Sequence, residues 1–471
     1  MSRICLLPLL ILLAAMPVRA QSTPGDIFPP EISAALGQAG IPESDVGVYV
    51  RNLSSDREVL AVNADRPMNP ASVMKLVTTF AALELLGPAY KWQTQAWIDG
   101  LLENGRLEGN LALKGYGDPK FDIERLWAFL RELRHRGIRE ITGDLLLDRS
   151  YFATGPHDPS LFDNEPSRPY NVGPDALLLN DKSFRLQFVP DVATRSVEIF
   201  SEPVLPQILV VNKLELGAGG CDSWPEKASI ADDVMYFSGI FPAACGEKFR
   251  YFSLLAPDEY AQTLFRQIWE QVGGTWTGRA RPAAVPSDAT LFATSESAPL
   301  ADLMREVNKY SINVMARQIY LTLGARDDPP ATLEKSRSAI DNWLMNRHLS
   351  FPELAIENGA GLSRTDRISS RHLGDLLAAA YRSPLMPEFV ASLSLTSVDG
   401  TMKKRLANSP AAARSHVKTG YVDGVRAIAG YTLNERADVI AIVMLINHAE
   451  ARNAQAAQDA LLEWAHADPA K

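Results

Sequence analysis

Residues 70–88 read PASVMKLVTTFAALELLGP. Apolar residues at helical spacing follow the first proline and stop at Gly-Pro, so we expect a helix over residues 72–86. Residues three apart share one face of a helix, which places the Lys75 amine one turn from the Ser72 hydroxyl. The free N–H groups and the dipole at a helix start also favour negative charge developing at Ser72. The stretch therefore predicts a serine nucleophile with a lysine base beside it.

A second short motif, Ser311-Ile312-Asn313, has the form Ser-x-Asn. We expect Ser311 to relay protons and Asn313 to hold a substrate amide, because an asparagine side chain offers both a donor and an acceptor. Taken in isolation, the same residues also fit the polar start of a helix.

A third motif, Lys418-Thr419-Gly420, leads into an alternating strand pattern. Lys418 and Thr419 suit a substrate carboxylate, through charge and hydroxyl donation, and Gly420 lets a substrate backbone come close. Lysine acts as a base only when its ammonium form is destabilised. Lys418 is therefore also the candidate for the neighbouring cation that lowers the pKa of Lys75.

A competing Ser-x-x-Lys pattern occurs at Ser415 and Lys418. Strand residues three apart point to opposite faces, so this pair is not expected to form a nucleophile and its base. Ser72 remains the better nucleophile, and we expect the backbone N–H groups of Ser72 and Tyr421 to form an oxyanion hole.

Outside these motifs, the two ends of the chain show α/β patterning and the middle shows short strand-like runs. Strands are predicted at residues 46–53, 58–62, 425–431 and 439–446, and helices at 301–323, 330–346 and 451–465. The stretch from about 95 to 290 reads as a mostly β insert with helices at 122–137 and 257–272. One discontinuous domain that carries inserted domains is therefore expected.

The ordered trio resembles the motifs of class A β-lactamases and penicillin-binding proteins. The long interval between Ser72 and Ser311 is similar to that of the class C low-molecular-mass penicillin-binding proteins, the D-alanyl-D-alanine carboxypeptidase/endopeptidase family of the penicillin-binding protein 4 type. Further matches are GYGDP at 115–119, ENGAGLSR at 357–364, VDGT at 398–401 and KTGYVDGVRAIAGY at 418–431. The sequence departs from the family pattern at Ile312, Tyr421 and Asp423.

The resemblance implies an α/β (α+β) fold, with a transpeptidase-like domain whose five-stranded antiparallel sheet is flanked by helices, plus inserted β-rich domains. The domains expected from it are a discontinuous catalytic domain at 21–95 and 285–471, an inserted domain II at 96–165 and 250–284, and an inserted domain III at 166–249.

The implied activity is hydrolysis of D-alanyl bonds in peptidoglycan stem peptides and cross-links through an acyl-enzyme on Ser72, which β-lactams also acylate. One alternative is a β-lactamase-like serine hydrolase, but the chain has no Glu-x-x-Leu-Asn segment to supply a deacylation base. Another is a non-catalytic envelope binding protein, although binding alone would not require both Ser72 and Lys75.

A pocket for the diamino acid of the stem peptide is also implied, since family positions of this kind resemble Asp148 and Arg364. The amine and the carboxylate of that residue each need an opposite charge. Asp423 is placed with the substrate-binding residues as well. The plain alternative is an aspartate at a strand end and a surface arginine.

The amino terminus has the pattern of an export signal. Arg3, the apolar run 4–16 and Val18-Arg19-Ala20 predict a signal peptide over residues 1–20, and hence a periplasmic protein with a peripheral membrane association left open. Cys221 and Cys245 remain after cleavage; an even count in an exported chain favours a disulfide over two buried thiols.

Composition narrows the possible partners. The net charge is −9 and no basic run occurs, which argues against nucleic-acid binding. The chain has no CxxC, HExxH or histidine cluster, so we expect no metal and no cofactor. The expected partners are peptidoglycan peptides and β-lactam antibiotics, and the sequence carries no prediction of oligomeric state.

Overall fold

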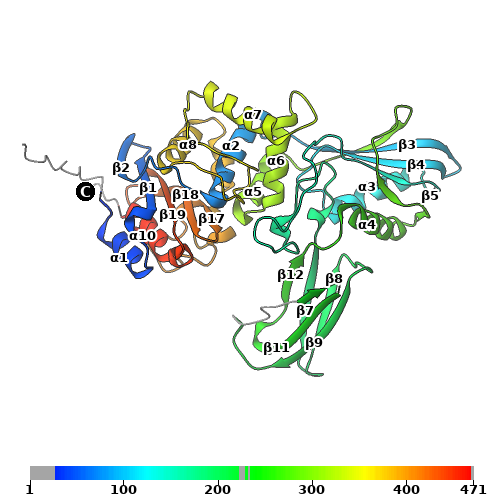
Figure 1. The fold of residues 1–471 in the computed structure, drawn as a ribbon, viewed down its shortest axis with the longest axis horizontal. Coiled ribbons are helices and arrows are strands. Elements are labelled where there is room, and N and C mark those ends of the chain that lie inside the picture. Colours follow the sequence, from blue (N-terminus) through cyan, green and yellow to red (C-terminus); the bar gives the residue numbers. More distant parts are fainter. Residues whose placement is uncertain (1–26, 222–228, 232–233, 468–471) are drawn as a thin grey trace, which may run out of the picture.

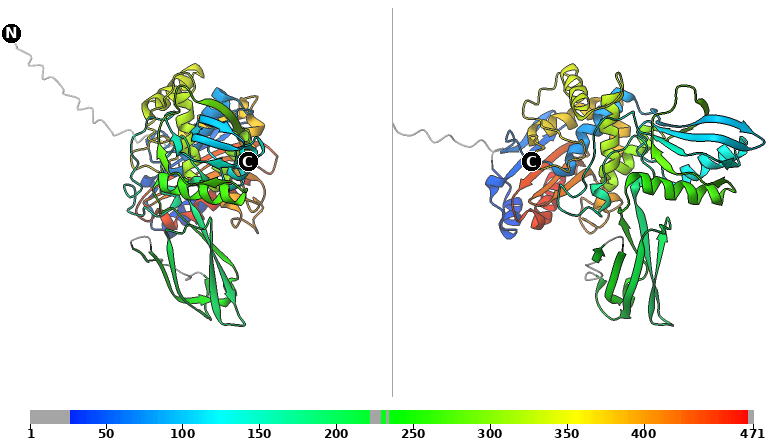
Figure 2. Two further views of the ribbon diagram at one scale, coloured as in Figure 1. Left: turned by 90° about the vertical axis from the view of Figure 1, so that its right-hand side faces the viewer. Right: turned by 45° about the vertical axis from the view of Figure 1, so that its right-hand side comes forward.

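The computed structural model describes residues 27–221, 229–231 and 234–467. The predicted signal peptide lies outside these residues. Figures 1 and 2 show three parts: a helix-covered sheet that contains both chain ends, a second sheet with two helices beyond it, and a small β-sandwich that projects from their junction.

The first part is built on one antiparallel sheet whose two faces are both covered. Its strand order is β16(Ser394–Leu395)-β17(Ser415–Val422)-β18(Val425–Leu433)-β19(Val439–Asn447)-β1(Val46–Asn52)-β2(Arg57–Val62). Because β19 is apolar at nearly every position, alternate residues serve opposite cores. Ala441 and Val443 join one core and Ile440 and Ile442 the other. The predicted five-stranded sheet gains the two-residue β16 as a sixth strand.

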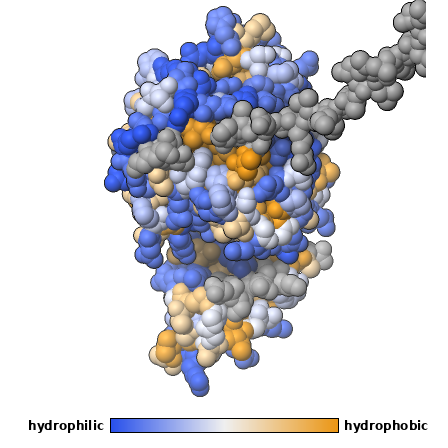
Figure 3. Space-filling view, turned by 90° about the vertical axis from the view of Figure 1, so that its left-hand side faces the viewer, coloured by the Kyte–Doolittle hydropathy of each residue, from blue (hydrophilic) through white to orange (hydrophobic). Residues whose placement is uncertain are grey.

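Helices cover this sheet unequally. One face packs against a helical layer, and the other against the two terminal helices (Figure 1). The layer comprises α2(Lys75–Leu86), α5(Leu300–Tyr310), α6(Asn313–Ala325), α7(Leu333–Asn346), α8(Ser370–Arg382) and α9(Met386–Ala391). The terminal pair is α1(Pro30–Gln38) and α10(Gln455–His466). At this end of the molecule hydrophilic side chains predominate, and hydrophobic ones form small separate groups (Figure 3).

One helix prediction was wrong. A single helix was expected over residues 301–323, but α5 and α6 are separate, because Ser311 adopts the left-handed conformation with φ of 61°. Such a conformation is unfavourable for a residue with a Cβ atom, so contacts from elsewhere in the fold must hold it.

The second part is a mixed seven-stranded sheet. Its strands are β3(Gln93–Glu103), β4(Arg106–Gly115), β5(Glu140–Ile141), β6(Leu145–Asp148), β13(Thr275–Trp276), β14(Ala280–Pro282) and β15(Thr290–Glu296). Helices α3(Ile123–His135) and α4(Pro257–Gln271) pack against it. This sheet crosses the expected domain boundaries at residues 95 and 285. Strand β3 runs through residue 95, and it pairs with β15, which lies beyond residue 285 in the part expected to be catalytic. The division into domains stays a prediction.

The β-sandwich consists of two three-stranded sheets. One has the order β12(Lys248–Phe252)-β7(Phe184–Asp191)-β8(Ser196–Glu202), and the other β10(Ser229–Ala231)-β11(Val234–Pro242)-β9(Leu209–Gly217). Phe188 and Phe237 meet across its interior, with ring centroids 5.1 Å apart. Cys221 and Cys245 form a disulfide, which confirms that prediction.

Candidate active site

Ser72 and Lys75 meet at the start of α2. Residues Ala71–Met74 form a 3-10 turn that runs directly into the α-helix. Residues three apart eclipse each other in a 3-10 turn, and Lys75 Nζ lies 3.0 Å from Ser72 Oγ. The contact expected from their spacing is therefore made, by a tighter turn than the predicted α-helix.

Lys75 is fully buried and its amine is surrounded by acceptors. Besides Ser72 Oγ, Nζ donates to Asn313 Oδ1 at 2.7 Å and to the carbonyl of Ala360 at 2.5 Å. Burial lowers the pKa of Lys75 well below its ordinary value, and the positive charges of Lys418 and Arg317 add to this. A neutral amine keeps two hydrogens for Asn313 and Ala360, and its lone pair can then accept the proton of Ser72.

Ser311 and Lys418 form a second pair. Lys418 Nζ donates to Ser311 Oγ at 2.9 Å and to the carbonyl of Thr419 at 2.6 Å. Burial lowers the pKa of Lys418 to about 7. A group with this pKa can release and take up a proton near neutral pH, which suits a relay through the Ser311 hydroxyl. Asn313, two residues on, links this pair to Lys75.

Gly420 sits where β17 touches the turn that carries the nucleophile. A Cβ atom at Gly420 would lie 2.7 Å from the carbonyl oxygen of Pro70 and 3.0 Å from the backbone nitrogen of Ser72. Only glycine leaves this approach free. The β17 backbone at Gly420 therefore lies beside the Ser72 N–H, one residue before Tyr421. The hydroxyl of Thr419 on the same strand bonds to Thr401 at 2.8 Å.

The side chains of Tyr421 and Asp423 are both exposed. The Tyr421 ring lies 5.8 Å from the guanidinium of Arg426, on the same hairpin. Arg364 Nη1 donates to the backbone carbonyl of Asp423 at 2.7 Å, and its guanidinium lies 4.6 Å from the ring centre of Phe162. Arg364 and Asp423 thus come together through the main chain, and Arg364 ties the β17–β18 turn to a loop of the insert.

Asp148, in contrast, is only 1% exposed at the end of β6. Its two carboxylate oxygens accept hydrogen bonds from the backbone nitrogens of Ser150 and Val285, each at 2.9 Å, and Lys114 Nζ lies 3.6 Å away. Burial raises the pKa of Asp148, but these hydrogen bonds outweigh burial and hold it below its usual range. A carboxylate enclosed in this way joins two segments of the insert, which favours the alternative of a structural aspartate over the expected pocket role.

We therefore expect Asp148→Ala to destabilise the insert without changing substrate preference. The variant leaves two backbone N–H groups without their acceptor, which costs ~1–3 kcal/mol of unfolding free energy. Thermal melting should show the loss, while kcat/KM on a diaminopimelate-containing peptide and the rate of penicillin acylation stay equal to the wild type at 25 °C. Asp288→Ala, at an exposed aspartate, is the control and should leave the melting temperature unchanged. A selective loss on the peptide would return Asp148 to the substrate site.

Ser415 does not form a second nucleophile. It is fully buried, and its hydroxyl bonds to Thr432 on the neighbouring strand at 2.8 Å, while the Lys418 amine reaches Ser311 instead. The strand argument against this pair is confirmed.

The segment Glu357–Asp366 was matched in the sequence, but its role was not foreseen. It presents the Ala360 carbonyl to Lys75, and Gly361 allows it to do so, since a Cβ atom there would lie 1.9 Å from the carbonyl oxygen of Ala71. Asp366 holds the segment by accepting from the Glu357 nitrogen at 2.8 Å. Every residue has a backbone carbonyl, so residue type cannot identify Ala360 as the acceptor for Lys75. Only the glycines on either side, Gly359 and Gly361, which both have positive φ, could have indicated an unusual backbone there.

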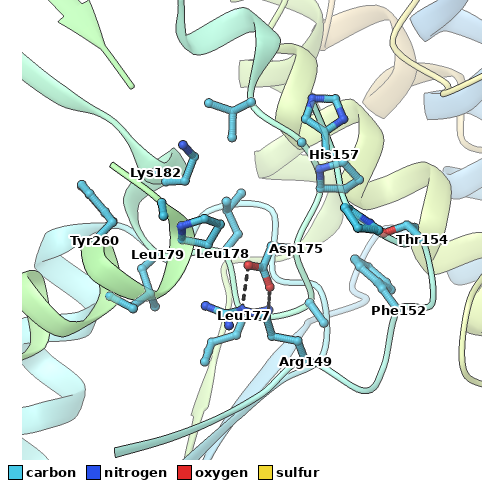
Figure 4. A pocket seen from close by; sticks show the side chains of 18 of the residues that line it. Arg149, Phe152, Thr154, His157, Asp175, Leu177, Leu178, Leu179, Lys182 and Tyr260 are labelled. Atoms are coloured by element: carbon cyan, nitrogen blue, oxygen red, sulfur yellow. Dashed lines mark hydrogen bonds and ion pairs between the residues drawn. The ribbon is translucent and has the colours of Figure 1, made fainter. Parts of the chain in front are cut away.

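The cavity of largest volume among the four described is separate from these residues. It measures about 580 Å³ and lies within the insert, where Asp175 and Arg149 form an ion pair of 2.8 Å on its wall (Figure 4). A second cavity of about 340 Å³ shares the segment 154–157 with it and reaches Arg317, Ser363 and Arg364. The second cavity is therefore the one that adjoins the Ser72 region.

Comparison with known proteins identifies the family of the chain. A family model described as the D-Ala-D-Ala carboxypeptidase 3 (S13) family matches residues 30–468. The chain belongs to this family. D-alanyl-D-alanine carboxypeptidase DacB of Haemophilus influenzae is 25% identical over 419 residues, with 86% of each chain covered. D-alanyl-D-alanine carboxypeptidase of Actinomadura sp. is 25% identical over 418 residues, which cover 85% of this chain and 77% of that protein.

Solved structures agree with the sequence match. The crystal structure of penicillin binding protein 4 (dacB) from Haemophilus influenzae superposes with a TM-score of 0.72 at 25% identity, covering 88% of this chain and 93% of that one. The same protein complexed with a β-lactam gives a TM-score of 0.69 at 24% identity, with the same coverage. The resemblance to class C penicillin-binding proteins and the predicted fold class are confirmed. This S13 protein is a serine-type D-Ala-D-Ala carboxypeptidase.

Within the described residues, no three His, Cys, Asp or Glu side chains gather in a way that could hold a metal ion. None of the helices in residues 27–221, 229–231 and 234–467 has the length and apolar character needed to cross a bilayer.

Proposed function

We propose that this protein is a periplasmic D-alanyl-D-alanine carboxypeptidase and endopeptidase that trims peptidoglycan stem peptides and opens their cross-links through an acyl-enzyme on Ser72. The observation that carries the proposal is the contact between Ser72 Oγ and the buried Lys75 amine, whose pKa burial lowers well below its ordinary value. A serine without such a base is a weak nucleophile.

The acylation step follows from these contacts. Ser72 Oγ attacks the carbonyl carbon of the penultimate D-alanine while its proton moves to the neutral Lys75 amine. The carbonyl oxygen becomes an oxyanion, held by the N–H groups of Ser72 and Tyr421. When the C–N bond breaks, the leaving amine takes a proton through Ser311 and Lys418. Water then attacks the ester and releases the shortened peptide.

Substrate orientation is assigned to the β17 edge and its neighbours. Lys418 and Thr419 bind the terminal carboxylate in a carboxypeptidase reaction, and Asn313 binds the peptide amide next to the scissile bond. Arg364 is the remaining candidate for the carboxylate of a diamino acid, because it is exposed and borders the cavity of about 340 Å³. β-Lactams present a similar carboxylate and a strained amide, and we propose that they acylate the same serine.

Labelling with a fluorescent penicillin tests the function against both alternatives. We expect one stable covalent label per chain, together with release of D-alanine from a stem pentapeptide and cleavage of a cross-linked dimer. Rapid loss of the label with hydrolysis of free penicillin would indicate a β-lactamase-like hydrolase. Absence of labelling in folded protein would indicate a non-catalytic binding protein.

A further inference from the structure

The sandwich exposes an aromatic surface on the sheet β12-β7-β8. The inner face of this sheet is core, whereas Phe200, Phe249 and Tyr251 on the outer face are 52%, 45% and 56% exposed. The strand registers place these rings together: Phe249 pairs with Gln187, which pairs with Phe200. Exposed aromatics grouped in this way mark an interaction surface rather than scattered residues. We call this outer face the aromatic platform.

Polar groups are interleaved with the rings of the aromatic platform. Arg185 lies between Tyr251 and Glu202 in the next cross-strand row, forms an ion pair with Glu202, and stacks 4.9 Å from the centre of the Phe249 ring. Gln187 bonds to Glu247 at 3.0 Å. The cation of the platform is thus paired, and the surface offers rings and hydrogen-bonding groups rather than a net positive field.

The aromatic platform continues into a groove against α4. A cavity of about 510 Å³ joins Phe200 and Gln187 to Gln267 and Gln271 of the helix. A neighbouring cavity of about 380 Å³ shares Arg185 and Glu202 with it.

The cavity of about 380 Å³ extends to Glu306 of α5 and Met315 of α6, the helices on either side of Ser311. The groove therefore follows the corner between the sandwich and α4 seen in Figures 1 and 2, toward the helices that hold the active site.

These features fit a neutral sugar polymer. A pyranose ring has an apolar C–H face that stacks on an aromatic ring, and its hydroxyl and acetamido groups pair with amides such as Gln187, Gln267 and Gln271. A membrane surface would instead select a basic rim around apolar residues, and a stable protein partner a larger apolar centre with few charges.

We propose that the aromatic platform and its groove bind the glycan strand of peptidoglycan. The inference rests on the proposed function, because the stem peptides that the active site cleaves are attached to that strand. Binding the strand beside the active site raises the local concentration of peptides without taking part in chemistry. Its loss should therefore raise KM for glycan-linked peptides and spare free peptides.

The test is a titration of the full-length mature protein with peptide-free glycan strands. The double variant Phe200→Ala/Phe249→Ala should bind about 10-fold or more weakly than the wild type, since two stacking rings are lost. Tyr236→Ala is the matched control, because Tyr236 is a 42% exposed aromatic on the opposite sheet of the same sandwich. Its affinity should stay within twofold of the wild type, and all three proteins should melt at similar temperatures.

A kinetic comparison separates this inference from the proposed function. D-Alanine release from a free pentapeptide should be equal in the wild type and the double variant, whereas release from intact strands should fall in the double variant. No glycan binding by the wild type, or equal binding by the double variant, would overturn the inference, as would retention on lipid vesicles in place of glycan. Failure of the wild type to act on the free pentapeptide would contradict the proposed function alone.

Discussion

Ser72→Ala is expected to abolish covalent labelling by penicillin, with a fall in acylation rate of at least ~10⁴-fold. The variant removes the oxygen that forms the ester, and the Lys75 amine bonds to no other hydroxyl in the described contacts, where Nζ meets Ser72 Oγ, Asn313 Oδ1 and the Ala360 carbonyl. Labelled protein on a denaturing gel and the intact mass after incubation with penicillin measure the loss. The fold should persist, because alanine fits the 3-10 turn.

Ser415→Ala is the matched control for this experiment. It removes the serine of the second Ser-x-x-Lys pattern, and we expect labelling at the wild-type rate with ~1 kcal/mol lost in stability, from the hydrogen bond to Thr432. Labelling that survived Ser72→Ala and disappeared with Ser415→Ala would reverse the assignment of the nucleophile.

Lys75→Met is expected to lower the acylation rate by ~10²–10⁴-fold, the usual contribution of a positioned base. In the wild type, the rate should rise with pH as Lys75 loses its proton, because only the neutral amine accepts the proton of Ser72. Burial and the charges of Lys418 and Arg317 lower the pKa of Lys75, so this rise should lie well below the pH at which an ordinary lysine side chain titrates. In Lys75→Met the residual rate should no longer follow this titration.

Stopped-flow acylation by a chromogenic β-lactam across pH measures both effects. Methionine is close to lysine in length and suits a buried site, so the melting temperature serves as the folding check. Lys404→Met, at an exposed lysine, is the control and should leave rate and pH profile unchanged. A wild-type rate in Lys75→Met, or an unchanged pH profile, would show that another group takes the proton.

Local spacing accounts for much that was predicted correctly. Ser72 and Lys75 are three residues apart on one turn, so their contact follows from any helical geometry, 3-10 or α. The alternating and continuous apolar runs similarly indicated β1, β18 and β19, because side-chain direction in a strand depends only on position parity.

Other features depend on segments far apart in the chain. The helical spacing of apolar residues was read as continuing past Ser311, yet the helix breaks there. Lys418, 107 positions away, bonds to the Ser311 hydroxyl, and a Cβ at Gly400 would lie 2.6 Å from the carbonyl of Lys309. The left-handed conformation of Ser311, which local propensity disfavours, therefore occurs where β17 and the turn at Gly400 pack against the end of α5.

The surroundings of Asp148 likewise depend on a segment that is distant in the sequence. Its place at a strand end was read correctly, but whether a strand end faces solvent, a substrate or another segment depends on what packs over it. Here the chain at Val285 covers it, 137 positions later in the sequence, and takes up its carboxylate. Residue types and short-range spacing thus indicated the chemical groups and the family, whereas burial, pKa and the partners of each group arose from long-range packing, which brings together segments whose proximity no local pattern encodes.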